Sequence, residues 1–145
     1  MQHENFDLAI TEFAQSIGLL VRRARMASVS DEVSWTETAV LKRLAKGPAT
    51  TADLARAQGM RPQSMRTIVA SLEKLAMVQR KPHPTDGRQV NLELTAKGAA
   101  AQKDLAEAKH NWLARTFAQL DPRERETIFA AGAIIRRVVN PEQPS

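Results

Sequence analysis

The chain has 145 residues, of which 43% are hydrophobic and 26% charged, and it contains no cysteine. This length fits one compact domain or one small domain with extensions, and the composition argues against wholesale disorder. The lack of cysteine excludes disulfides, thiolate metal sites and thiol-based redox sensing by this chain. No apolar run approaches the roughly 18 residues that a membrane span needs, and the first residues lack a signal-peptide pattern, so we expect a cytoplasmic protein with no membrane partner.

The net charge of +5 is concentrated in one segment. Residues 56–90 contain seven Lys or Arg and only two Asp or Glu, so this segment accounts for the whole net charge and the rest of the chain is neutral overall. A basic segment in an otherwise neutral chain is typical of a protein that binds a polyanion. Judged on charge alone, a solvated surface with an accidental cluster explains the segment equally well.

Two helices are predicted before the basic segment. Residues 6–24 place apolar side chains at alternating steps of three and four, which gives a helix with a continuous apolar stripe. Ser34 and Glu37 have the spacing of a capping box at the start of a second helix. Gly47 and Pro48 then end that helix.

The next two predicted helices form a helix-turn-helix. Thr50 is a candidate cap for a short helix over residues 51–58, and Gly59 ends it. Pro62 suits the first turn of the following helix, because its missing N–H needs no partner there. This last helix, the recognition helix, is predicted to bury one arc of side chains and so to pack on the first. The arc comprises Met65, Ile68, Val69 and Leu72.

A β-hairpin is predicted where the apolar period changes from 3.6 to 2. Residues 90–94 alternate in polarity, with Val90, Leu92 and Leu94 on one side, which is typical of a half-buried strand. Residues 78–81 are the expected partner strand, and Asp86-Gly87 is a strong turn signal between them. We call residues 78–94 the wing.

Two further helices follow the wing. Thr95 is the expected cap of a long helix, and Asp121, Pro122 and Glu124 mark the start of the last one. The tail, residues 140–145, is expected to fray. The expected inner face of the long helix includes Leu105, Trp112, Thr116 and Leu120, and that of the last helix Ile128, Ala131, Ile135 and Val138.

The stretch from Leu54 to Gly98 resembles the winged helix-turn-helix core of the MarR family of bacterial transcriptional regulators. The matching motifs are LA in the short helix, LEKLAMVQR at the exit of the recognition helix, and DGR followed by LELTAKG. The resemblance implies a mainly α (α+β) fold with a dimerisation helix in residues 1–33, a DNA-binding domain in 34–95 and dimerisation helices in 96–145. It also implies a homodimer that binds a pseudo-palindromic duplex. Many members release DNA when a small, often aromatic, anionic molecule binds.

Two positions depart from the usual family pattern. Arg61 stands where the recognition helix commonly begins with a Ser or Thr cap, which leaves the satisfaction of the helix N-terminus in doubt and adds a cation near a possible phosphate. Ala76 stands where the exit of that helix commonly has Gly, so a left-handed backbone there is less comfortable.

The exposed face of the recognition helix is the predicted reader of DNA. The N-terminal residues of such a helix usually reach the base edges, where Arg suits guanine and Gln suits adenine. An ordinary solvated helix surface is the alternative, and the adjacent basic wing argues against it. We expect base-edge or phosphate contacts from Gln63, Ser64, Arg66 and Thr67, and a backbone contact from Lys74.

The wing is the second predicted DNA contact, because a hairpin tip fits the minor groove and arginine suits its negative potential. The resemblance implies that Arg88 enters the groove and that Asp86 orients it or a neighbouring cation. Arg80 and Lys81 are expected near phosphates, and His83 near a phosphate or solvent. Taken alone, DGR is better explained by a routine hairpin turn.

A ligand pocket is predicted between the dimerisation helices and the winged domain, by the same resemblance. Its candidate lining residues are Phe13, Ile17, Trp35, His110 and Trp112, for a small aromatic or lipophilic effector. Core or dimer-interface roles are the alternative for all five.

No catalytic or metal-binding constellation is found in the sequence. The three histidines are far apart and lack a paired carboxylate or thiolate at ligand spacing, so we expect no metal, no cofactor and no enzyme. The sequence therefore predicts a sequence-specific DNA-binding regulator, and a repressor released by an effector. The alternative is a protein-interaction adaptor on a winged-helix scaffold, which has no need for a basic recognition helix and wing.

Overall fold

The computed structural model of the protein describes residues 2–140, which form six helices and two strands in the order predicted. They group into two compact units that meet between Lys109 and His110, and each unit is described by itself. The tail expected to fray lies outside the described residues from residue 141 on. The division at residues 33/34 and 95/96 stays a prediction. Among the described helices, none is long and apolar enough to cross a membrane.

Helix α1 (Gln2–Ala27) extends beyond the predicted residues 6–24 at both ends. Of its apolar stripe, Ala24 is buried in the first unit, whereas Phe6, Ile10 and Phe13 are exposed. A single chain therefore leaves most of this stripe uncovered.

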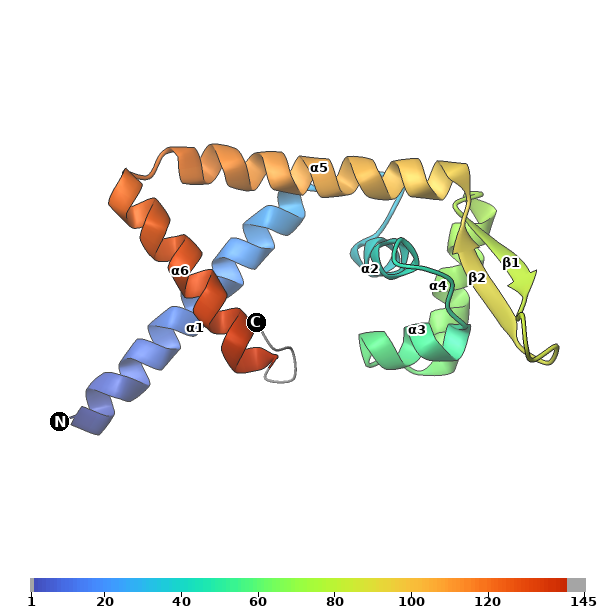
Figure 1. Cartoon of the computed structure of the whole chain (residues 1–145), viewed down its shortest axis with the longest axis horizontal. Coiled ribbons are helices and arrows are strands. Elements are labelled where there is room, and N and C mark those ends of the chain that lie inside the picture. The colour runs from blue at the N-terminus through green and yellow to red at the C-terminus, as the bar shows by residue number, and fades with distance from the viewer. Residues whose placement is uncertain (1, 141–145) are drawn as a thin grey trace. The chain divides into compact units, whose positions relative to one another are not determined.

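Three helices and the hairpin enclose the core of the first unit (Figure 1). They are α2 (Trp35–Leu44), α3 (Thr51–Gln58) and α4 (Pro62–Lys74), and α4 is the recognition helix. Most of the predicted arc of α4 is fully buried, and Ile68 packs partly buried at its margin. The completely buried side chains include Leu41, Leu54, Met65, Val69 and Leu72.

Local capping signals explain where α2 and α3 begin. Thr50, the candidate cap, forms a complete capping box with Asp53 on α3. Ser34 accepts a hydrogen bond from the Glu37 backbone N–H at 3.3 Å, but the Glu37 side chain does not complete the box. Its carboxylate instead accepts from the Ser71 hydroxyl of α4 at 3.4 Å, because a tertiary partner lies within reach.

Both departures from the family pattern have structural consequences at the ends of α4. Arg61 is the N-cap and makes no side-chain capping hydrogen bond. Ala76 has φ of 60°, the left-handed conformation that costs an L-residue roughly 1–2 kcal/mol. The chain turns there from α4 into the wing.

The wing consists of β1 (Val78–Pro82) and β2 (Val90–Leu94), which pair antiparallel with Val78 opposite Leu94. Leu92 is fully buried and exchanges both backbone hydrogen bonds with Ala49, which fixes the hairpin to the helices. Among the three alternating apolar residues of the predicted half-buried strand, Val90 is the most exposed, at 42%. Val90 lies at the distal end of the hairpin, which extends past the helices (Figure 1).

Helix α5 (Ala96–Ala118) begins in the first unit and ends in the second. Thr95 caps it as predicted, because its hydroxyl accepts from the Gly98 backbone N–H at 3.0 Å. Gly98 is buried against the Met77 backbone. The start of α5 is thereby held against the turn that leaves the recognition helix.

The second unit contains the end of α5 and helix α6 (Pro122–Val139), which starts with the predicted capping box of Asp121 and Glu124. Phe117 and Phe129 pack edge to face with ring centroids 6.0 Å apart. The prediction that α6 buries its apolar face is wrong for the single chain. Ile128 is 38% and Val138 68% exposed, because nothing in this unit covers them.

Candidate nucleic-acid interface

The exposed face of α4 carries the predicted DNA-reading residues. Their side chains lie opposite the buried arc, which is fixed in the core by Met65, Val69 and Leu72. Arg61, the N-cap residue, makes no side-chain hydrogen bond to the first turn, so the backbone N–H groups there remain available to a phosphate oxygen. The exposed residues are Gln63, Ser64, Arg66, Thr67 and Lys74.

The tip of the wing is organised by two side chains. His83 Nδ1 accepts the backbone N–H groups of Thr85 at 3.3 Å and Asp86 at 3.1 Å. Asp86 Oδ1 accepts the Arg88 backbone N–H at 3.0 Å, so Asp86 positions Arg88 through the backbone. The Arg88 side chain is exposed at the tip.

The two cations predicted to lie near phosphates each have a carboxylate partner. Arg80 donates from Nε to both oxygens of Glu73, at 3.0 and 3.1 Å, and its terminal nitrogen lies 2.8 Å from Glu73 Oε1. Lys81 Nζ lies 3.2 Å from Glu93 on the neighbouring strand. The hydrogen bond and charge of Glu73 raise the pKa of Arg80 above its ordinary value.

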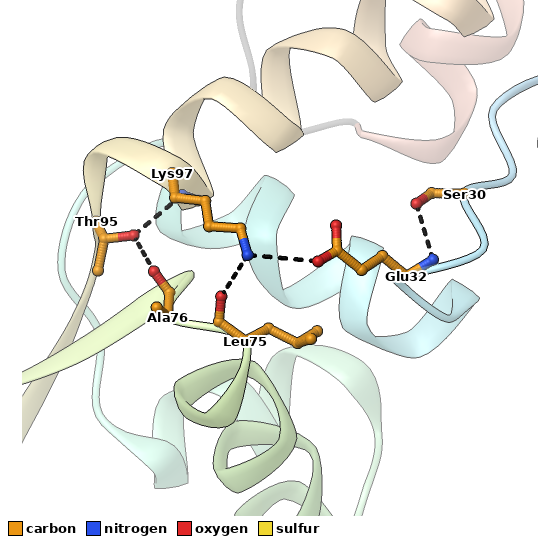
Figure 2. Close-up of polar contacts among 7 residues, drawn as sticks. Ser30, Glu32, Leu75, Ala76, Thr95 and Lys97 are labelled. Atoms are coloured by element: carbon orange, nitrogen blue, oxygen red, sulfur yellow. Dashed lines mark hydrogen bonds and ion pairs between the residues drawn. The ribbon is translucent and has the colours of Figure 1, made fainter.

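A lysine at the start of α5 ties the exit of α4 to the loop before α2 (Figure 2). Lys97 Nζ donates to the Leu75 carbonyl at 2.9 Å and lies 3.3 Å from Glu32 Oε1. The Thr95 hydroxyl donates to the Ala76 carbonyl at 2.5 Å beside it, and Ser30 accepts the Glu32 backbone N–H at 3.1 Å. The Leu75 and Ala76 carbonyls around the left-handed turn are therefore satisfied by Lys97 of α5 and by Thr95, the residue that caps it.

The five predicted ligand residues do not line one cavity within either unit. Phe13 and Ile17 lie on the exposed stripe of α1, and the Trp35 ring has the Arg25 guanidinium 3.8 Å from its centroid. In the second unit, His110 lines a shallow apolar groove together with the Phe117–Phe129 pair, and Trp112 is half-buried.

A cavity of about 300 Å³ in the first unit has a different lining from the one predicted. Six of its ten lining residues are apolar, and the polar ones are Ser28, Ser30, Glu32 and Asp104. It adjoins the Lys97 contacts through Glu32. The lining residues are Ser28, Val29, Ser30, Glu32, Val33, Met77, Ala101, Asp104, Leu105 and Ala108.

Comparison with known proteins agrees with this architecture. A MarR family model matches residues 32–89. An HTH-type transcriptional regulator of Mycobacterium tuberculosis is 33% identical over 131 residues, which cover 90% of this chain and 92% of the relative. The chain belongs to the MarR family of transcriptional regulators. A second relative in this bacterium, an HTH-type transcriptional repressor, is 31% identical over 113 residues, covering 76% of this chain and 81% of the relative.

Several solved structures share the fold of this MarR-family protein. RV1404 from M. tuberculosis has a TM-score of 0.79 at 25% identity and covers 90% of this chain and 92% of its own. A transcriptional regulator from Pseudomonas aeruginosa PA01 has a TM-score of 0.78 at 26% identity, with coverages of 96% and 99%. A mutant of Staphylococcus aureus MepR bound to an oligodeoxyribonucleotide has a TM-score of 0.67 at 16% identity, with coverages of 90% and 97%. The family match and the two M. tuberculosis relatives, a transcriptional regulator and a transcriptional repressor, favour the DNA-binding regulator over the adaptor.

The sequence did not reveal which residues of this DNA-binding regulator pair with its cations. Glu73 and Arg80 are seven residues apart across a turn, and Glu32 and Lys97 are 65 apart. Of these pairs, Lys81–Glu93 was the easiest to predict from the sequence, because Glu93 lies diagonally opposite Lys81 once the hairpin register is known.

Proposed function

We propose that the protein is a cytoplasmic, homodimeric repressor that binds a pseudo-palindromic duplex and is released by a small molecule. The observation that carries the proposal is a row of cations along α4 and the wing tip. Among the described residues, four of them make no side-chain ion pair. Because no carboxylate pairs with these four cations, they are free to contact phosphates and bases. They are Arg61, Arg66, Lys74 and Arg88.

The geometry of the first unit supports simultaneous contact with two grooves. An α-helix fits the major groove with its N-terminal residues toward the bases, and the exposed residues of α4 cluster at that end. Arg88, at the tip of a slender hairpin, suits the neighbouring minor groove.

Uncovered apolar surface supports the homodimer. The stripe of α1 and the face of α6 that includes Ile128 and Val138 are exposed in the single chain. Large apolar surfaces left open in this way mark interaction sites. A two-fold dimer reads two half-sites separated by whole helical turns of DNA.

Selection of bound duplexes from a random pool tests DNA binding. We expect an inverted repeat, and Arg88→Ala should weaken binding to the selected duplex by about 1–3 kcal/mol. Arg66→Ala should relax the base preference at its position, whereas Gln102→Ala on α5 is a control outside the proposed interface. An Arg88→Ala protein that binds like the parent at every salt concentration removes the wing from the interface.

The 300 Å³ cavity is the proposed effector site. Apolar walls with two carboxylates suit a lipophilic molecule that is neutral or carries a positive charge. A bound cation competes with Lys97 for Glu32, and Lys97 also holds the carbonyl of Leu75 at the end of α4. A molecule bound in the cavity thereby alters a contact at the end of the recognition helix.

A matched pair of probes tests the chemistry of this site. We expect 1-naphthylmethylamine, a cation, to bind the protein and release the selected duplex, and 1-naphthoate, an anion of similar size, to do neither. Asp104→Asn should weaken the amine, and Lys97→Met should uncouple its binding from DNA release. Stronger binding of the naphthoate, or full release from Lys97→Met, contradicts the assignment.

A further inference from the structure

The cations of the basic segment fall into two groups. Arg56, Arg80 and Lys81 each have a carboxylate partner, on Asp53, Glu73 and Glu93. Within residues 2–140, no such partner is found for the remaining four cations of this segment. The net charge of the segment counts both groups alike, although only the unpaired cations are free to bind a phosphate.

The Glu73–Arg80 ion pair has a geometry that restrains the relative orientation of its two residues. Two guanidinium nitrogens of Arg80 engage both oxygens of Glu73, at 2.8 to 3.1 Å. Such two-point contacts constrain direction as well as distance. By contrast, Lys81 approaches Glu93 through one nitrogen at 3.2 Å and joins two strands of the same hairpin.

The pair also joins two different elements. Glu73 lies one residue before the end of α4, and Arg80 is the central residue of β1. Between them the chain passes through Ala76, in the left-handed conformation. The ion pair therefore spans the turn at which the wing leaves the recognition helix, and it restrains the angle between them.

We propose that Arg80 is a positioning residue, and that its pair with Glu73 sets the wing at the angle from which α4 and Arg88 reach adjacent grooves together. This inference rests on the proposed function. Glu73 already balances the Arg80 charge, so Arg80 displaces no counterion from the DNA. Arg80 then contributes to affinity through the shape of the protein, and its removal leaves the salt dependence of binding unchanged.

Salt dependence separates a positioning residue from a phosphate contact. The logarithm of the binding constant falls with the logarithm of salt concentration by about 0.9 per phosphate neutralised. Lys74→Gln is the matched control: it removes one free cation from each subunit, so the slope for the dimer should flatten by about 1.8. Arg80→Gln should weaken binding to the selected duplex about tenfold at every salt concentration, with the slope of the parent.

Two variants of the partner complete the experiment. Glu73→Gln should lose the same affinity as Arg80→Gln, again with an unchanged slope. The double exchange Glu73→Arg with Arg80→Glu rebuilds the pair in reverse and should recover most of the lost affinity. Because the pair is half-exposed, at 52% and 31% of the two side chains, these variants should fold, and the circular dichroism spectrum of each verifies this.

Opposite outcomes overturn the inference. If Arg80→Gln flattens the slope as much as Lys74→Gln does, Arg80 is a phosphate contact. If Glu73→Gln binds more tightly with a steeper slope, Glu73 restrains a DNA-binding cation instead of positioning the wing. Failure of the double exchange to recover affinity also refutes the link. A parent protein that selects no duplex refutes the proposed function as well, which distinguishes the two failures.

Discussion

Gly98 of α5 packs directly on the backbone of Met77, and replacing it with alanine is expected to destabilise the protein. A Cβ at position 98 would lie 2.8 Å from the Met77 carbonyl carbon and closer still to its oxygen. Non-bonded carbons normally approach to about 3.5–4.0 Å. The Met77 backbone is held from both sides, since its N–H donates to Leu72 at 3.0 Å and its carbonyl accepts from Thr95 at 3.0 Å.

The expected cost of Gly98→Ala follows from three effects. Overpacking costs about 1–3 kcal/mol, and a displaced Met77 loses both of its backbone hydrogen bonds, about 1 kcal/mol each. Alanine returns about 1 kcal/mol through its higher helix propensity. The net loss of about 2–4 kcal/mol corresponds to a fall of about 5–15 °C in Tm for a chain of this size.

Urea unfolding followed by circular dichroism at one fixed protein concentration measures this loss, because the stability of a dimer depends on concentration. Ala100→Gly, an exposed position in the same helix, is the control and should cost only about 1 kcal/mol. A Gly98→Ala protein as stable as the parent would show that the start of α5 is not pressed against the turn after α4.

Three further predictions concern stability. Ala76→Gly should raise the free energy of unfolding by up to about 1 kcal/mol, because glycine relieves the left-handed φ of 60° but is more flexible when unfolded; equal denaturation midpoints contradict this. Hydrogen bonds from Thr50 hold the pKa of Asp53 below its ordinary value of 3.8, so the stabilisation that the Asp53 carboxylate provides is complete above pH 3.8 and is lost as the pH falls through the lower folded value. The difference in free energy of unfolding between the parent and Asp53→Asn should therefore be constant above pH 3.8 and shrink only below it. Partial burial, and then the charges of Lys42 and Arg25, lower the pKa of Lys109, which means that the folded protein disfavours a charge at this position. Lys109→Gln should therefore raise Tm, and the increase should be smaller in high salt, which screens the repulsion. An unchanged or lower Tm at low salt contradicts this prediction.

Short-range signals allowed the sequence to predict most of the fold. The starts of α3 and α6 depend on side chains three residues apart, Thr50 with Asp53 and Asp121 with Glu124, and both capping boxes are present. Ala76 is a different case, because alanine makes a left-handed backbone less comfortable, yet the chain adopts it there with φ of 60°. The exposed faces of α4 and the wing tip follow from helical and strand periodicity.

Apolar periodicity could not tell which faces the single chain covers. Ile128 and Val138 recur at helical spacing on α6, yet they are exposed because this unit provides no element to pack on them. A pattern of apolar residues records that a face avoids water, and it does not record whether the same chain or another covers it.

The sequence by itself determined the order of the elements, the starts of the capped helices and the concentration of positive charge on the recognition helix and wing, because each depends on neighbouring residues or on composition. Only the tertiary structure decided which charges are free. Arg80 and Lys97 read like other surface cations, and their partners, Glu73 and Glu32, come within reach only when the turn at Ala76 and the packing of Gly98 on Met77 bring distant segments together. An ion pair acts over a few ångströms in space, and separation along the chain does not reveal that distance.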